Sequence, residues 1–354
     1  MDRGRYISRY LVGILAMLLL VGPQATNGQE TPAGGETPDT KAMFDVDTYP
    51  RVSGSTSTMP LGQLVAARAL GLRGELRRVG KRWGFAPYAS PAPVVVTFPI
   101  STPNSHVGDH LGLMMGGAAH HGTHGAYTRL IQGQADLILV ARRPSADELK
   151  MAEEGRVELD VRLVALDAFV FLVNAANPVT SLSLEQVREI YSGKITGWGE
   201  VGGAEQDIVP FTRNPNSGSQ ELMLSLVMKD RRIVSDKRRM LMGMSGPIDR
   251  IAATRNGIAY SVYYYEHVMN RNSKNRVLAI GRVRPTPKTI ASGSYPLNTG
   301  VYVVAKKSAK AESAEIRLRN WLFSAEGQEV VRDSGYITVG DRVRQTTLQS
   351  LGGQ

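Results

Sequence analysis

The stretch from 213 to 219 reads Arg-Asn-Pro-Asn-Ser-Gly-Ser, so one fixed cation, two hydroxyls and a glycine lie within seven residues. Apolar residues then recur at helical spacing, and Ser217 with Gln220 fits the capping box that begins a helix. We therefore expect the hydroxyls and Gly218 at a helix N-terminus, where unpaired backbone N–H groups attract anions. Arg213 adds a planar fork that can hold two oxygens of a carboxylate or phosphate. The alternative is an ordinary cap on a surface helix.

Two earlier loops have the same character. Residues 53–58 read Ser-Gly-Ser-Thr-Ser-Thr, and Pro60 then suits the first turn of a helix. Residues 122–125, Gly-Thr-His-Gly, precede a helix that we expect over 126–134. If the loops at 54–58, 122–125 and 213–219 converge, they form a cage of donors. Such a cage is what a buried, dehydrated oxyanion needs, because nearly every oxygen must be hydrogen-bonded.

Strand and helix patterns alternate along the chain, which indicates an α/β fold. Arg142 and Arg143 follow the buried strand expected over 137–140, at the end where ligands of open α/β sheets bind. The Tyr263–Tyr265 run and Trp198 are interpreted as packing residues. Further strands are expected at 94–98, 161–174, 208–211, 256–261, 277–280, 289–297 and 301–304. Further helices are expected at 145–151, 183–190 and, as one C-terminal helix, 318–331.

The N-terminal region predicts export. Three arginines precede an apolar run over about 10–21, and small residues follow, which is the order of a secretory signal. The run is short of the roughly 20 residues that span a bilayer, although an uncleaved anchor is the alternative. We therefore predict a signal peptide at 1–28, a linker at 29–48, and a periplasmic or extracellular location.

Composition excludes several classes of site. With no cysteine among 354 residues, the chain has no disulfide and no thiolate metal site. The formal net charge is +10, but the basic clusters lack regular aromatic neighbours, so we read them as solvated faces and expect no nucleic acid. Five of six histidines lie in 106–124, where glycines oppose a regular helix. We expect neither a metal site nor a cofactor there, and His124 should hold the Thr123 turn within a loop.

In this order, the motifs resemble the phosphate-binding proteins of bacterial phosphate ABC importers. The resemblance covers about residues 50–340 and is most specific from 192 to 219. The segments that carry it are Gly54–Ser57, Gly122–Gly125 with Ala135–Leu137, Tyr191–Trp198 with Val201–Gly203, Arg213–Ser219 and Thr289–Leu297.

The resemblance implies a two-lobe type II periplasmic-binding-protein fold, with a hinge and an interlobe cleft. Lobe 1 would comprise 49–165 and 280–345, and lobe 2 would comprise 166–279. It implies a monomer that captures inorganic phosphate, or a related oxyanion, for an ABC permease of the inner membrane. The ligand contacts that it implies are Thr56, Ser57, Thr123, Arg213, Ser217, Gly218 and Ser219, with Ser55 and Arg142 as further candidates.

Two positions depart from the family pattern. Pro215 stands where well-studied members have an aspartate, and Val140–Ala141 stands where many have Ser-Ser or Ser-Asp. Preference for phosphate over sulfate is therefore implied by the family and not by these residues. The alternatives are a surface, signalling or adhesion protein that keeps the fold with another ligand, and a phosphatase-type hydrolase. Because no nucleophile elbow, P-loop, HExxH motif or carboxylate pair is present, we expect no enzyme.

Overall fold

The computed structural model describes residues 42–71, 74–79, 82–87, 120–234 and 236–340. The predicted signal peptide, most of the linker, the strand expected over 94–98, His106 and His110 lie outside the described residues. Among the residues that are described, no helix has the length and apolar character needed to cross a membrane.

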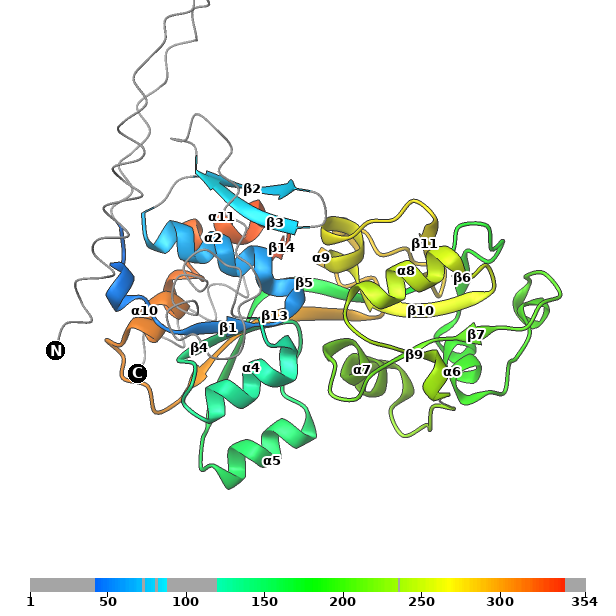
Figure 1. The fold of residues 1–354 in the computed structure, drawn as a ribbon, viewed down its shortest axis with the longest axis horizontal. Helices are drawn as coiled ribbons and strands as arrows, with labels where there is room; N and C mark the ends of the chain where they lie inside the picture. The colour runs from blue at the N-terminus through cyan, green and yellow to red at the C-terminus, as the bar shows by residue number, and fades with distance from the viewer. Residues whose placement is uncertain (1–41, 72–73, 80–81, 88–119, 235, 341–354) are drawn as a thin grey trace, which may run out of the picture. The chain divides into compact units, whose positions relative to one another are not determined.

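One long strand, β5 (Leu159–Asn174), organises the sheet. The strand order is β1 (Val52–Gly54), β4 (Leu137–Val140), β13 (Asn298–Lys306), β5, β10 (Gly257–Val262) and β7 (Val209–Pro210). Strands β11 (Asn275–Val277) and β14 (Ile337–Thr338) also pair with β5. Figure 1 shows β5 and β13 side by side, in agreement with their antiparallel pairing from Asn298 to Lys306.

Helices and short elements complete the described part of the chain. The helices are α2 (Met59–Ala69), α4 (Gly122–Ile131), α5 (Ala146–Glu154), α6 (Leu184–Ser192), α7 (Gly218–Leu222), α8 (Ser245–Ala253), α9 (Pro287–Ala291), α10 (Ala314–Trp321) and α11 (Ala325–Asp333). The short 3₁₀ helices are η1 (Val46–Thr48), η2 (Thr56–Thr58), η3 (Trp198–Val201) and η5 (Lys237–Arg239), and the π-helical turns are η4 (Met223–Met228) and η6 (Tyr265–Met269). The remaining strands are β2 (Gly74–Val79), β3 (Arg82–Pro87), β6 (Ser181–Leu182), β8 (Thr212–Arg213), β9 (Met240–Leu241) and β12 (Ala279–Ile280).

The core confirms the packing interpretations. Trp198 is buried, and its indole N–H donates to the carbonyl of Asn256 at 2.9 Å. The three tyrosines at 263–265 are also buried. An aromatic cluster of Phe169, Phe171, Tyr191 and Tyr260 joins β5 to β10 and α6, with ring centroids 5.4–6.2 Å apart. The burial of such apolar side chains is the main stabilising contribution to a fold of this kind.

Three secondary-structure predictions were wrong. The segment 289–297 is not a strand, because Pro287 at the first helical turn and the Thr286 cap begin α9. The single C-terminal helix is two helices, since the Ser324 side chain caps a separate α11. The helix expected over 126–134 begins at Gly122, so the presumed loop at 122–125 forms its first turn.

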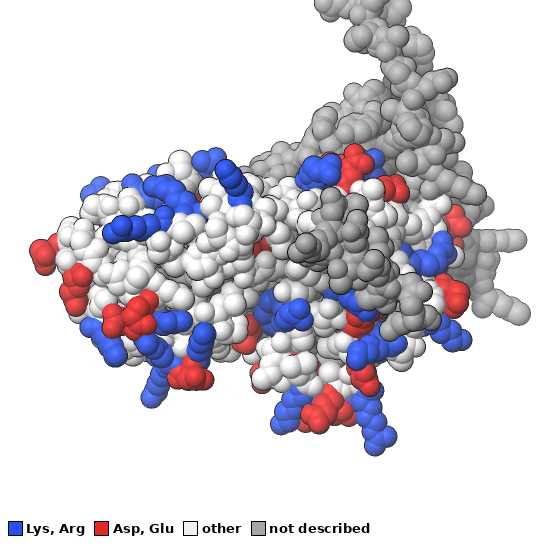
Figure 2. Space-filling model, turned by 180° about the vertical axis from the view of Figure 1, so that it is seen from behind, with Lys and Arg blue, Asp and Glu red and all other residues white. Residues whose placement is uncertain are grey.

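Surface charges are mixed on the face drawn in Figure 2, where Lys and Arg alternate with Asp and Glu. Arg231 lies 2.5 Å from Glu185, and Arg238 lies 3.0 Å from Asp236. Exposed pairs of this kind contribute little stability, so these basic residues are ordinary solvated charges.

Candidate functional site

Three segments far apart in the sequence meet around one cavity of about 430 Å³. They are 55–57, 121–125 and 213–219, of which Pro215 does not line the cavity. Ala141, Leu222, Met242, Gly243, Met244 and Val262 complete the lining. Of the sequence-predicted site residues, the structure thus brings together Ser55, Thr56, Ser57, Thr123, Arg213, Ser217, Gly218 and Ser219, and leaves Arg142 outside the lining.

The first segment lies between β1 and α2, and hydrogen bonds to β4 and to Tyr336 fix its backbone. The Thr58 hydroxyl donates to the carbonyl of Leu139 at 2.7 Å, which fixes the turn of η2 against β4. The Tyr336 hydroxyl donates to the carbonyl of Ser57 at 2.9 Å. Gly54 is required here, because a Cβ would lie 2.7 Å from the Leu139 carbonyl oxygen. The hydroxyls of the segment are therefore presented by a fixed backbone.

The second segment is the first turn of α4. Gly122 takes φ +69°, which favours glycine, and Thr123 follows as a buried residue. The hydroxyl oxygens of Thr123 and Ser55 lie 2.8 Å apart, so the first and second segments touch through a hydrogen bond. His124 lies on this helix and not in a loop, which corrects the expectation; its Nδ1 lies 3.1 Å from Glu148 Oε1.

Arg213 is the charged group of the cavity. Its side chain is buried, with Nε donating to the carbonyl of Leu241 at 3.0 Å and Nη1 3.6 Å from the sulfur of Met244. No described carboxylate lies within ion-pair distance of its guanidinium. Burial lowers the pKa of Arg213, because desolvation disfavours the charged form. A buried cation without a counterion favours an anionic ligand.

The third segment continues into α7. The Ser217 side chain accepts from the N–H of Gln220 at 3.2 Å, which confirms the predicted helix start. The reciprocal half of the capping box is absent from this turn, because the Gln220 side chain instead accepts from the Arg213 N–H at 3.1 Å and from the Tyr260 hydroxyl. A Cβ at Gly218 would lie 2.7 Å from Thr123 Oγ1. The second and third segments are thus in contact at a glycine.

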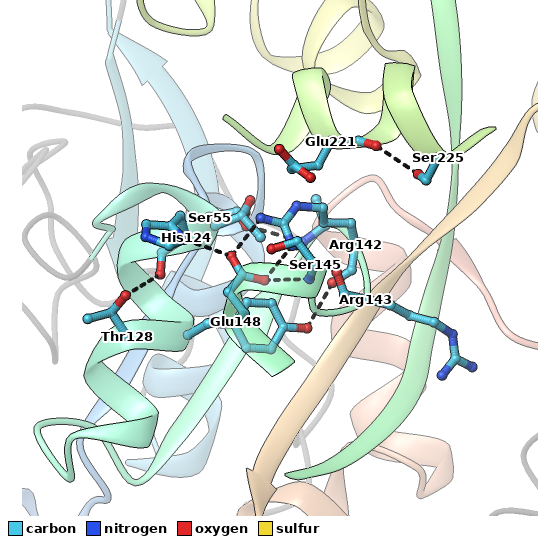
Figure 3. A network of polar contacts seen from close by, with 12 residues as sticks. Ser55, His124, Thr128, Arg142, Arg143, Ser145, Glu148, Glu221 and Ser225 are labelled. Atoms are coloured by element: carbon cyan, nitrogen blue, oxygen red, sulfur yellow. Dashed lines mark hydrogen bonds and ion pairs between the residues drawn. The ribbon is translucent and has the colours of Figure 1, made fainter. Parts of the chain in front are cut away.

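Arg142 has a different environment (Figure 3). Its guanidinium forms two hydrogen bonds of 2.7 Å with Glu148, which also accepts from the N–H of Ser145 at 2.7 Å. Burial is the largest single effect on the pKa of Glu148 and would raise it, but the hydrogen bonds and charge of Arg142, with the Ser145 N–H and His124, together outweigh burial and lower the pKa. Glu221 of α7 faces this network, and burial raises the pKa of Glu221. Arg142 therefore has its own buried counterion and braces α4 and α5.

Sequence reasoning missed the wall formed by Met242, Gly243 and Met244. The Met244 sulfur lies 3.6 Å from Arg213 Nη1 and 3.8 Å from the Ser219 hydroxyl. Strand β9 brings this wall to the site by pairing in parallel with β8, which ends at Arg213. Strands of two residues leave no periodic signal in the sequence.

The described residues contain no group of three or more His, Cys, Asp or Glu side chains able to hold a metal ion. His121 and His124 line the cavity, while the nitrogen Nδ1 of His120 lies 3.3 Å from the Thr56 hydroxyl. Burial lowers the pKa of His120.

The chain is similar to proteins of a known family. A family model described as the PBP superfamily domain matches residues 119–326. The phosphate-binding protein PstS of Staphylococcus epidermidis is 27% identical over 237 residues, covering 65% of this chain and 72% of its own length. The protein of the same name from Pseudomonas aeruginosa is 24% identical over 246 residues, covering 63% and 74%.

Two solved structures share the fold. One is a putative phosphate ABC transporter substrate-binding protein with bound phosphate from Clostridium perfringens, with TM-score 0.56, 20% identity, and coverage of 82% of this chain and 98% of that one. The other is an ABC-type phosphate transport receptor from Vibrio cholerae, with TM-score 0.55, 21% identity, and coverage of 81% and 98%.

Proposed function

The chain belongs to the PBP superfamily and has the two-lobe type II periplasmic-binding-protein fold, and from this premise we propose that it captures inorganic phosphate, or a related oxyanion, for an ABC importer. The observation that carries the proposal is Arg213, a buried cation without a described counterion, facing a cavity lined with hydroxyls. A cavity with one cation and neutral donors suits a small oxyanion that must be released again.

The proposed contacts come from all three segments. Arg213 would supply the charge, and hydroxyls or backbone N–H groups would satisfy the ligand oxygens. The donors are Ser55, Thr56, Ser57, Thr123, Ser217, Gly218 and Ser219. Arg142 would act indirectly, because it pairs with Glu148, and Glu148 Oε1 lies 3.1 Å from Nδ1 of His124, the neighbour of Thr123 on α4.

The relatives named above are solute-binding proteins and not enzymes, which supports binding without catalysis here. Export through the segment 1–28 would place a monomeric protein in the periplasm or outside the cell. There it would deliver its ligand to a permease of the inner membrane. The lobes would comprise 49–165 with 280–345, and 166–279.

Isothermal titration calorimetry with inorganic phosphate tests the proposal. We expect saturable binding that Arg213→Ala weakens at least tenfold, since hydrogen bonds to charged groups contribute about 1.5–3 kcal/mol. Arg143→Ala is the matched control, because that arginine is exposed, lies over the Tyr302 ring and does not line the cavity. Equal affinity of Arg213→Ala and the unaltered protein for every oxyanion tested would end the proposal.

A panel of phosphate, sulfate and arsenate, measured by thermal shift at two pH values, identifies the ligand. Because Pro215 replaces an acidic residue of the family pattern, the phosphate-to-sulfate ratio must be measured and not assumed. A protein that melts at the same temperature with each oxyanion would favour an adhesion or signalling role.

A further inference from the structure

Asp167 is a buried carboxyl group that the proposed binding site does not use. Its side chain lies in the middle of β5 and is 1% exposed. Oδ1 accepts hydrogen bonds from the backbone N–H groups of Ala168 at 2.8 Å and Tyr264 at 3.0 Å. Oδ2 is buried and has no hydrogen-bond partner among the described residues. Burial raises the pKa of Asp167 to about 7, and the two N–H donors only partly oppose it.

Asp167 lies next to the point where the pairing of β5 passes from β13 to β10. Asp167 is paired with Thr299 of β13, whereas Phe169, two residues later, is paired with Val262 of β10. The hydrogen bond from Tyr264 ties this point to the segment that follows β10. A movement of one part of the sheet against the other must therefore alter the surroundings of the Asp167 carboxyl group.

A continuous path of contacts leads from Asp167 to the first segment of the cavity. The ring of Tyr264 stacks on that of Tyr336, with centroids 3.6 Å apart and an interplanar angle of 10°. The Tyr336 hydroxyl donates to the carbonyl of Ser57, and Ser57 lines the cavity. The Tyr264 hydroxyl is itself fixed by the carbonyl of Ser334 at 2.6 Å. Each step is a direct contact between buried groups.

We propose that Asp167 is a positioning residue for the segment Ser55–Ser57, and that its ionisation weakens oxyanion capture as the pH rises. This inference rests on the proposed function. The neutral carboxyl group fits the buried position, whereas an ionised group with unpartnered Oδ2 favours conformations that bring water or a donor to that oxygen. Such conformations displace Tyr264, and through Tyr336 they displace Ser57.

The titratable groups that face Asp167 do not compete for this role. They are the hydroxyls of Tyr263, Tyr264 and Tyr336, whose pKa values burial raises and Asp167 raises further. All three stay neutral near pH 7. Glu266 and Arg271 also interact with Tyr263; burial raises the pKa of Glu266, and the charge of Arg271 opposes that rise. Among the groups that face this point of β5, the tyrosines thus stay neutral, and Asp167 changes charge near neutrality.

The test measures the phosphate affinity of the unaltered protein and of Asp167→Asn between about pH 6 and pH 8.5, by calorimetry. The ratio of the two dissociation constants cancels the ionisation of phosphate itself. We expect the ratio to change about three- to tenfold across this range, as a pKa difference of half to one unit between two conformations requires. Asp249→Asn, at an exposed position on α8, is the control and should give a flat ratio.

Tyr336→Phe provides a second test that leaves Asp167 in place and removes only the hydrogen bond to Ser57. We expect this variant to lose most of the part of the pH dependence of phosphate affinity that Asp167 causes. If Asp167→Asn does not fold, the comparison of Tyr336→Phe with the unaltered protein decides the question. Phosphate binding with a flat Asp167→Asn ratio, or a Tyr336→Phe profile parallel to that of the unaltered protein, overturns the inference and leaves the proposed function standing. Absence of phosphate binding at every pH overturns both.

Discussion

Replacing Gly218 by alanine tests whether the second and third segments act as one binding site. The new Cβ would lie 2.7 Å from Thr123 Oγ1, whereas ordinary contacts begin near 3.4 Å, so the two groups must separate by about 0.7 Å. Gly218 is not in the left-handed region, so the effect would come from this contact and not from backbone strain. Thr123 is buried and bonded to Ser55, and therefore cannot yield without moving a second donor.

The expected loss follows from displacing one donor from a charged ligand. A hydrogen bond to a charged group contributes about 1.5–3 kcal/mol, which corresponds to a dissociation constant about ten- to a hundredfold larger. Calorimetry with phosphate measures the affinity, and thermal melting shows whether the protein stays folded.

Gly62→Ala is the matched control, because a Cβ at this position of α2 would meet none of the described atoms within 4 Å. Alanine inside a helix should leave the phosphate affinity unchanged and raise the melting temperature slightly. In the double variant with Thr123→Ala, the Gly218→Ala substitution should weaken binding less than it does alone, because the clash is gone. If the phosphate affinity of Gly218→Ala lies within twofold of that of the unaltered protein, the contact between the two segments does not contribute to binding, and the reasoning is refuted.

Three further outcomes are expected. Glu148→Gln should lower the free energy of unfolding in urea by about 3–5 kcal/mol, because it leaves the buried guanidinium of Arg142 without its counterion; Glu154→Gln, at an exposed pair, should change it little. In the absence of ligand, Asp167→Asn should raise the melting temperature more at pH 8 than at pH 5. The pKa of Asp167 is raised from 3.8 in the unfolded chain to about 7 in the folded protein, so its contribution to stability declines as the pH rises from 3.8 through 7. Equal shifts of the melting temperature at both pH values would contradict this. Arg213→Lys should keep part of the phosphate affinity that Arg213→Ala loses, since lysine retains the charge but not the planar fork, and a calorimetric titration that ranks lysine below alanine would exclude a role for charge.

Local sequence signals predicted the elements that carry the site because their causes are local. Proline at the start of α2 and a serine cap at Ser217 act within one helical turn, and both helices begin where these residues indicate. The strand at 137–140 was evident because every residue of it is apolar and buried. The convergence of the three segments, in contrast, came from a family resemblance, since no spacing rule relates Thr56 to Arg213.

Sequence reasoning is weakest where a side chain has two possible partners. Arg142 at a strand end was interpreted as a ligand contact, although Ser145 and Glu148 form a capping box whose carboxylate can hold that arginine. The same limitation hid Asp167, which lies within an apolar run and whose burial depends on a pairing with β13 more than 100 residues away in sequence.

Arg142 and Arg213 are both buried, and the difference between their partners bears on the proposed reversible capture. Arg142 has Glu148 as its internal counterion, so its charge is neutralised whether or not a ligand is bound. Arg213 has no described carboxylate at ion-pair distance, so the Leu241 carbonyl offsets its desolvation only in part, and an entering anion would supply the missing counter-charge. If both arginines faced the cavity unpaired, the anion would be held more strongly and released more slowly, because affinity differences among related sites lie mostly in the dissociation rate. A single uncompensated cation among neutral donors would therefore favour anions and still allow release, as the proposed delivery to a permease requires.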